Sequence, residues 1–323
     1  MTELEGRVAV VTGGASGVGR ALGARFARAG MRVVLADVEK SALDATVAAL
    51  RAQGGDVSGF VTDVSDFASV ASLARHCFET HGAVHLLCNN AGIGTDESRT
   101  MLWDSTENDW KWAFAVNAWG VLNGVRAFVP EMLKRGEPGR VVNTSSGNGG
   151  LVLIPTTPVY ATTRSAVSTL TEALHLQLKL VRAKLEASVL YPGPHVVAMN
   201  IFNAARNRPA ELPPERPLGK PPTLDDLRAW SEKAGRGFKV TTPEEVADYA
   251  FDGIRAGRFY PLPESADMDQ RIRARVEGVL ARRRPGASAR LNSLRGVVRG
   301  GAEDSLRHGR GLGVDAALVH FRA

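Results

Sequence analysis

The fold of this chain is decided near its N-terminus, by Val10-Val11-Thr12-Gly13-Gly14-Ala15-Ser16-Gly17-Val18-Gly19. A β-branched run leads into a glycine-rich turn, and helical composition follows over Gly19–Ala29. The glycines permit a sharp turn and let the backbone approach a pyrophosphate, while the start of the helix offers free N–H groups and a positive dipole end. Because the turn joins a strand to a helix, this stretch predicts a phosphate-binding β-α-β unit.

The same alternation continues over the first 190 residues. Near-continuous apolar runs are typical of strands buried on both faces of a parallel sheet. The predicted strands are Val8–Val11, Val33–Ala36, Val57–Val61, Val84–Cys88, Val141–Thr144 and Ser188–Leu190, with Arg258–Leu262 as a last strand. Predicted helices lie between them at Gly19–Ala29, Ser41–Gln53, Phe67–Thr80, Trp110–Arg135 and Tyr160–Lys184. This order predicts an α/β fold, a doubly wound parallel sheet with helices on both faces.

The alternation stops between Pro192 and about Gly237. Six prolines within residues 209–222 exclude a regular helix or a central strand there, and a loop this long is usually functional or disordered. A helix cap with an acidic first turn follows at Thr242-Pro-Glu-Glu-Val. We therefore expect one domain over residues 1–262 that includes a substrate lid at 194–237, then a C-terminal helix at 263–284 and a Gly/Arg-rich tail at 285–323.

The net charge of +6 is confined to the C-terminal end of the chain, from residue 281 onward. Residues 281–323 hold nine arginines and three acidic groups, so the rest of the chain is neutral. A basic tail can bind phosphate backbones by charge alone, but such a segment is more often simply solvated, so we expect no specific nucleic-acid partner.

Cysteine use and hydropathy indicate the compartment. Two cysteines cannot build a disulfide framework, which favours a reducing environment. No run approaches the roughly 20 apolar residues of a membrane span, and the acidic N-terminus has no signal-peptide pattern. The expectation is a cytoplasmic protein without a membrane contact. No C-x-x-C or H-E-x-x-H spacing indicates a metal site.

Asp37 closes the second predicted strand, eighteen residues after Gly19. A carboxylate at this place can accept hydrogen bonds from both ribose hydroxyls of adenosine, and it repels a 2′-phosphate. With the glycine turn, it predicts NAD as cofactor in preference to NADP.

Further motifs follow in a fixed order. They are Asp63-Val64, Asn89-Asn90-Ala91-Gly92, Asn117 in Phe-Ala-Val-Asn, Ser145-Ser146, Tyr160 and Pro192-Gly193. Together with the glycine turn they resemble the short-chain dehydrogenase/reductase family over roughly residues 5–262, which implies a Rossmann fold and a homodimer or homotetramer. The resemblance implies cofactor contacts at Gly13, Ser16, Gly17, Val18, Gly19, Asp37, Asp63, Val64, Asn90, Ala91, Gly92, Tyr160, Arg164, Pro192 and Gly193.

The chemistry that the resemblance implies is centred on Tyr160. A base must take the hydroxyl proton as hydride leaves an alcohol for the nicotinamide. A free tyrosine, with a pKa near 10, is a poor base at neutral pH, and a cation four residues along the same helix would stabilise its phenolate. Ser146 would polarise the substrate oxygen, and Asn117 would hold a water that carries protons outward.

Three positions depart from the family pattern. Arg164 stands where the family has lysine; it keeps the charge but effectively never releases a proton. Ser146 lies 14 residues before Tyr160, one more than the commonest interval, which an insertion in the following glycine run would absorb; we therefore prefer Ser146 to Ser145. Val197 stands where the family commonly has a threonine that bonds the nicotinamide amide.

An apolar pocket is predicted from Ile93, Leu151, Leu153, Val159, Met199 and Phe202, with His195 as either a polar substrate contact or a solvent-facing loop residue. The leading hypothesis is an enzyme that interconverts a secondary alcohol and a ketone with NAD(H) on a medium-sized hydrophobic small molecule. Two alternatives stay open because of Arg164 and Val197. One is non-redox catalysis, such as cyclisation, dehydration or epimerisation, and the other is a cofactor-binding scaffold without turnover.

Overall fold

A computed structural model describes residues 4–97, 100–233 and 237–285. Six parallel strands form one sheet in the order β3-β2-β1-β4-β5-β6, which confirms the predicted doubly wound architecture. The strands are β1 (Val8–Thr12), β2 (Arg32–Asp37), β3 (Val57–Val61), β4 (Leu86–Asn89), β5 (Gly139–Thr144) and β6 (Leu185–Leu190). The order reverses between β1 and β4, and ligands of such sheets bind at this reversal, beyond the carboxyl ends of the strands.

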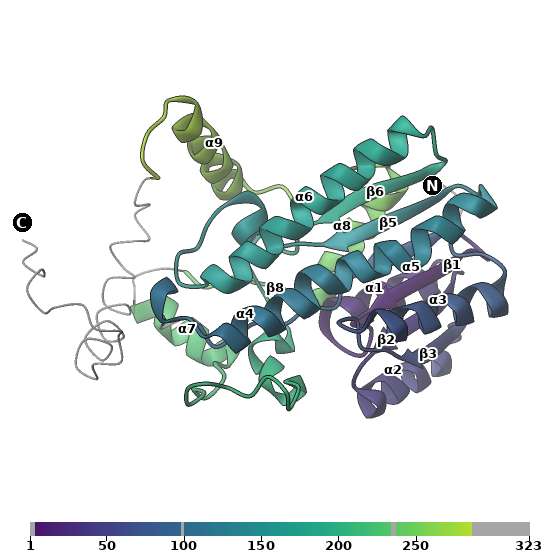
Figure 1. Cartoon of the computed structure of the whole chain (residues 1–323), viewed down its shortest axis with the longest axis horizontal. Coiled ribbons are helices and arrows are strands. Elements are labelled where there is room, and N and C mark those ends of the chain that lie inside the picture. The colour runs from purple at the N-terminus through teal and green to yellow at the C-terminus, as the bar shows by residue number, and fades with distance from the viewer. Residues whose placement is uncertain (1–3, 98–99, 234–236, 286–323) are drawn as a thin grey trace, which may run out of the picture.

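Helices cover both faces of the sheet (Figure 1). Along β1 the side chains alternate, so that Ala9 and Val11 belong to one apolar core and Val8 and Val10 to the other. The first core includes residues of α1 (Gly17–Arg28), α2 (Lys40–Ala52) and α8 (Pro243–Arg255). The second includes residues of α3 (Phe67–His81), α5 (Gly120–Arg135) and α6 (Pro158–Leu180).

The predicted helix at Trp110–Arg135 is a composite. It consists of α4 (Glu107–Phe114), a π-helical segment η2 (Ala115–Trp119) and α5. Thr106 is its N-cap residue, and the Thr106 side chain accepts from the Asp109 N–H. A π-helical turn inserts one extra residue and frequently occurs at functional sites. Here it contains Asn117.

The predicted strand Arg258–Leu262 is wrong. The segment runs beside β6, where the carbonyl oxygens of Phe259 and Pro261 accept from Val189 and Tyr191, at 2.9 and 3.2 Å. The ladder is not completed because Pro261 has no N–H to return to β6.

The lid holds more regular structure than the sequence indicated. It contains β7 (Val196–Val197), which pairs with β8 (Val240–Thr241), the 3₁₀ segment η4 (Asn200–Asn207) and α7 (Leu224–Lys233). Residues 209–222 contain no helix or strand. The capping box at Thr242 is present at the start of α8, and α9 (Ala266–Leu280) follows α8.

Among the described residues, no helix is both long and apolar enough to cross a bilayer. In the same ranges no cluster of His, Cys, Asp or Glu has the arrangement of a metal site. Most of the predicted tail, residues 286–323, lies outside the part that the structure describes.

Candidate active site

A cavity of about 1140 Å³ lies beyond the carboxyl ends of the strands. Its wall includes Asp37 at the end of β2, Asn90 after β4, Ser146 after β5 and Pro192 after β6. The lid and the start of α9 complete the wall. The cavity thus runs from the glycine-rich turn to the N-terminal end of α6.

The glycine-rich turn forms a cradle that side chains would fill. Gly13 has a positive φ of +66°, and a Cβ there would lie 2.8 Å from the Cα of Ala91. A Cβ at residue 19 would overlap the carbonyl oxygen of Gly13. Ser16 caps α1 without a side-chain hydrogen bond to the helix, so that the first N–H groups of α1 stay available to an anion. These features fit the pyrophosphate of a dinucleotide.

Carboxylate and amide groups lie on both sides of this cradle. Asp37 is half-buried, and its two oxygens accept from the backbone N–H groups of Ala15 and Glu39 at 2.9 and 3.1 Å, which fixes the carboxylate at the cavity wall. Asn90 is fixed by Thr12, whose carbonyl oxygen accepts from Asn90 Nδ2 at 3.1 Å.

Most of the remaining predicted cofactor residues line the cavity, and two lie behind its wall. Ser16, Gly17, Val18, Asp63, Val64, Ala91, Gly92 and Pro192 line the cavity. Gly19 lies behind the wall against Gly13, and Gly193 is buried, with its N–H donating to the Tyr249 hydroxyl at 3.2 Å.

Tyr160 and Ser146 line the same cavity. Tyr160 is half-buried in the first turn of α6, and Ser146 follows β5. Ser145 also lines the cavity, but its buried hydroxyl donates to the carbonyl oxygen of Arg164 at 2.8 Å and contacts Ser168 Oγ at 2.9 Å. Of the two serines, Ser146 is therefore the one whose hydroxyl is not committed to α6.

Arg164 lies under the tyrosine. The guanidinium carbon is 5.0 Å from the centroid of the Tyr160 ring, and Nη1 donates to the Thr144 carbonyl oxygen at 3.0 Å. The residue is only 3% exposed, its Nε has no hydrogen-bond partner, and it forms no ion pair with any described carboxylate. The guanidinium also occupies the space where a Cβ of Gly92 would be. A buried cation without a counter-charge is costly unless an anion approaches it.

Asn117 is fully buried in the π-helical turn. Its Oδ1 accepts from the Ile93 N–H at 2.8 Å, and its Nδ2 donates to the Ile93 carbonyl at 3.0 Å and to Thr163 Oγ1 at 3.1 Å. The side chain therefore ties the loop after β4 to α6 and does not line the cavity.

The apolar pocket differs in part from the prediction. Ile93, Met199 and Phe202 line the cavity, as does the exposed His195. Leu151, Leu153 and Val159 do not line it: Leu153 is 61% exposed and Val159 is buried behind the wall. Val152 and Ile154 line it instead, because the irregular η3 turn (Gly147–Leu151) reverses which side chains face inward. The side chain of Val197 is at the wall and can offer only apolar contact.

Sequence reasoning missed Glu97. Its carboxylate is 1% exposed and accepts from Val159 N at 2.6 Å, Tyr160 N at 2.9 Å and Thr95 Oγ1 at 3.1 Å. Burial raises the pKa of Glu97 to about 7, against these hydrogen bonds, which lower it, and with a smaller contribution from the charge of Asp109. No local signal in Thr95-Asp96-Glu97 distinguishes this residue from a solvated acid.

The start of α9 also closes the cavity. Asp267, Met268 and Arg271 line it, and Met268 Cε lies against Gly147, where a Cβ would come within 3.2 Å. The helix expected at 263–284 as a separate element thus borders the cavity.

Comparison with known proteins agrees with this geometry. Residues 7–207 match the family model of short chain dehydrogenases. The chain therefore belongs to the short-chain dehydrogenase family and is an oxidoreductase with a Rossmann-type fold.

Relatives come from several bacteria. 1-Deoxy-11-beta-hydroxypentalenate dehydrogenase of Streptomyces exfoliatus is 32% identical over 84% of this chain and 87% of its own length. The C alpha-dehydrogenase of a Sphingobium species is 30% identical over 86% of this chain and 88% of its own length. A crystal structure of a short chain dehydrogenase/reductase from Burkholderia phymatum in complex with NAD has a TM-score of 0.79 and 40% identity, covering 89% of this chain and 99% of that one.

Proposed function

We propose that this enzyme interconverts a secondary alcohol and a ketone with NAD(H), on a medium-sized hydrophobic substrate. One observation carries the proposal: Tyr160 and Ser146 line the cavity that contains the glycine-rich turn, and the unpaired Arg164 cation lies 5.0 Å from the Tyr160 ring. Ile93, Val152 and Phe202 supply apolar wall for the substrate.

Bound NAD would supply the acceptor for the hydride that leaves the alcohol carbon. Tyr160 takes the hydroxyl proton in the same step, and Ser146 holds the developing carbonyl oxygen by a hydrogen bond. In the reverse direction Tyr160 returns the proton to the oxygen. Arg164 acts as a fixed charge that favours the phenolate, since an arginine retains its proton at any working pH. Asn117 serves the reaction by fixing the backbone of Ile93 at the cavity wall.

The preference for NAD(H) rests on Asp37. The carboxylate is held at the wall by two backbone N–H groups, so it cannot easily turn away from a 2′-phosphate. Charge repulsion of this kind is worth about 1–3 kcal/mol, or roughly 5- to 150-fold in affinity.

The test is a panel of aliphatic, alicyclic and aryl secondary alcohols and ketones, followed by nicotinamide absorbance with NAD(H) and NADP(H). We expect turnover with NAD(H) and, in fluorescence titrations, tighter binding of NADH than of NADPH. Binding of NADH without any absorbance change across the panel would contradict the redox proposal. If NADPH bound as tightly as NADH, only the proposed role of Asp37 would be contradicted, and the redox proposal would stand.

A further inference from the structure

Glu97 supplies the N-terminal cap of α6 from a distant part of the chain. Thr157, the N-cap residue of α6, makes no side-chain hydrogen bond to the helix. The first N–H groups of a helix need such a partner, and two of them, at Val159 and Tyr160, donate to the Glu97 carboxylate. A buried carboxylate between two backbone donors fixes the start of α6, and with it the backbone of Tyr160.

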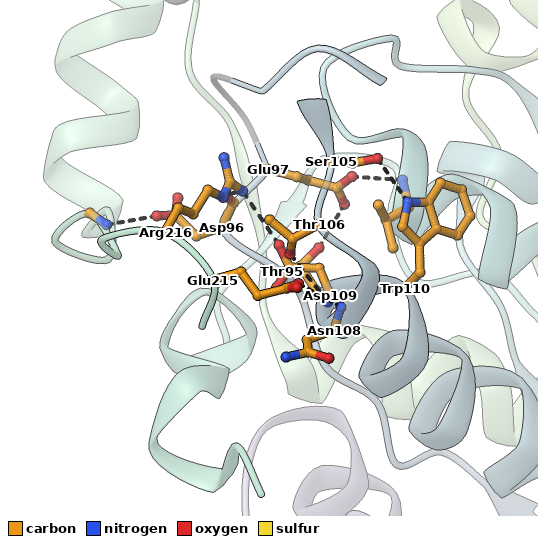
Figure 2. Close-up of polar contacts among 12 residues, drawn as sticks. Thr95, Asp96, Glu97, Ser105, Thr106, Asn108, Asp109, Trp110, Glu215 and Arg216 are labelled. Carbon is orange, nitrogen blue, oxygen red and sulfur yellow. Dashed lines mark hydrogen bonds and ion pairs between the residues drawn. The ribbon is translucent and has the colours of Figure 1, made fainter. Parts of the chain in front are cut away.

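The residue before Glu97 binds the lid. The Asp96 carboxylate accepts from the Gly219 N–H at 2.7 Å, and the backbone carbonyl oxygen of Asp96 accepts from the Arg216 side chain. Figure 2 shows Asp96 and Arg216 on one side of this segment and Glu97 on the other. Two adjacent carboxylates therefore hold the lid and the start of α6.

Further contacts tie the lid to α4 beside this segment (Figure 2). Arg208, whose side chain is 6% exposed, donates to Asp109 at 2.6 Å, and Arg216 lies 3.6 Å from the other oxygen of Asp109. The Asn108 N–H donates to Glu215 at 2.8 Å. The charged and titratable groups on the elements around Glu97 are thus Asp96, Asp109, Arg208, Glu215 and Arg216, with Tyr160 and Arg164 on α6.

We infer that Glu97 is a positioning residue for Tyr160, and that the Asp96–Glu97 pair links the seating of the lid to the placement of the tyrosine. The inference rests on the proposed function, since Tyr160 is taken as the acid/base. A misplacement of a reacting group by about 1 Å can cost roughly 100-fold in rate, so loss of this cap acts on turnover more than on cofactor binding.

The experiment compares Glu97→Gln, Glu97→Ala, Asp96→Ala and the double variant with the wild type between pH 6 and 9. We expect Glu97→Ala to lower kcat about tenfold or more and to leave the NADH dissociation constant within about twofold. In the wild type, kcat for ketone reduction, the direction in which Tyr160 gives its proton, should fall as the pH drops through about 7 and Glu97 takes a proton. Glu97→Gln should lack this acidic limb. Asp96→Ala should lower kcat less, and in the Glu97→Ala background it should add almost nothing, because coupled positions are not additive.

Asp66→Asn is the matched control. Asp66 caps α3 with a carboxylate that accepts from the N–H groups of Ala68 and Ser69, and it does not line the cavity. It should leave kcat unchanged. An unchanged kcat in Glu97→Ala, an acidic limb retained by Glu97→Gln or an equal loss in Asp66→Asn would overturn the inference for Glu97. If the losses of kcat in Asp96→Ala and Glu97→Ala were additive in the double variant, the link between the lid and the placement of Tyr160 would be overturned.

A readout without turnover separates the inference from the proposed function. Hydrogen–deuterium exchange at residues 158–162 should become faster in Glu97→Ala than in the wild type, because two amides lose their acceptor. If exchange is faster in Glu97→Ala but the wild type turns over no alcohol, the capping role of Glu97 stands and the proposed function is refuted. If exchange is unchanged in Glu97→Ala but the wild type is active, the proposed function stands and the capping role of Glu97 is refuted.

Discussion

The two ends of the cavity are built in different ways. At the cofactor end the shape comes from backbone: the absence of Cβ atoms at Gly13 and Gly19 makes the cradle, and local N–H groups hold Asp37. At the substrate end the wall comes from side chains of separate elements, such as Ile93 after β4, Phe202 on η4 and Met268 on α9. The cofactor end is therefore encoded in contiguous motifs, and the substrate end depends on tertiary contacts. Substitutions at the first should alter binding, and those at the second should alter turnover.

The largest effect is expected for Tyr160→Phe, which tests the substrate end directly. Removal of the hydroxyl should lower kcat by at least ~100-fold, the low end for a positioned proton-transfer group, while NADH affinity stays within a few-fold. Steady-state kinetics and fluorescence titration measure the two quantities. Tyr260→Phe is the control, because Tyr260 donates to Glu172 and does not line the cavity. Near wild-type turnover in Tyr160→Phe would remove the centre of the proposed chemistry.

Glu97 should make the stability of the protein depend on pH, because its carboxyl group is buried in the folded state. Its pKa rises from 4.5 to about 7 on folding, so the folded state holds the proton more tightly. Between these values the wild type should lose stability as the pH rises, by roughly 3 kcal/mol in all. Glu97→Gln does not titrate and should not show this loss.

Urea unfolding of both proteins at pH 5 and pH 8 measures the difference. Other groups titrate equally in the two proteins, so the change in their difference isolates Glu97. Parallel behaviour of the two proteins would mean that the carboxylate is solvated in the folded state.

The same division explains what the sequence could predict. The six strands, the glycine cradle and the position of Asp37 follow from short motifs and from the period of apolar residues, whereas Tyr160 was identified through the family resemblance. Glu97 could not be predicted, because its burial and its partners at residues 159 and 160 exist only after folding.

Three further differences have local physical causes. Leu151 and Leu153 were assigned to the pocket by hydrophobicity, but the irregular turn at η3 directs Val152 and Ile154 inward. The missing N–H of Pro261 prevents the last strand. The lid helix α7 is mostly polar and directly follows the proline-rich stretch, so the sequence assigned it to the irregular lid.

Arg164 joins the two ends, since its guanidinium contacts both the Tyr160 ring and the Gly92 backbone region. Arg164→Met should lower kcat and NADH affinity by about tenfold each, the size of one lost hydrogen bond to a charged group. It should not lower the unfolding midpoint, because the buried cation lacks a counter-charge. Arg164→Lys should retain activity. If Arg164→Met left kcat unchanged, a group other than Arg164 would have to stabilise the Tyr160 phenolate.

The smallest effect is expected where the lid touches the cofactor end. Arg206 on η4 donates to Glu39 at 2.6 and 3.2 Å, and this contact lowers the pKa of Glu39. The two side chains are 30% and 27% exposed, so solvent screens the pair. Arg206→Ala should therefore reduce NADH affinity less than ~5-fold and the free energy of unfolding by less than ~1 kcal/mol.

Both losses should shrink in 0.5 M salt, because the Debye length is then only about 4–5 Å. They should also shrink as the pH falls and Glu39 takes a proton, since a carboxylate with a lowered pKa stabilises the fold only while it is ionised. Lys40→Ala, which removes the neighbouring exposed pair with Asp44, should leave NADH affinity unchanged. If Arg206→Ala instead lost more than tenfold in affinity, the lid would hold the cofactor as firmly as the glycine cradle does. Tertiary side-chain contacts would then shape the cofactor end as well, and the division between the two ends would fail.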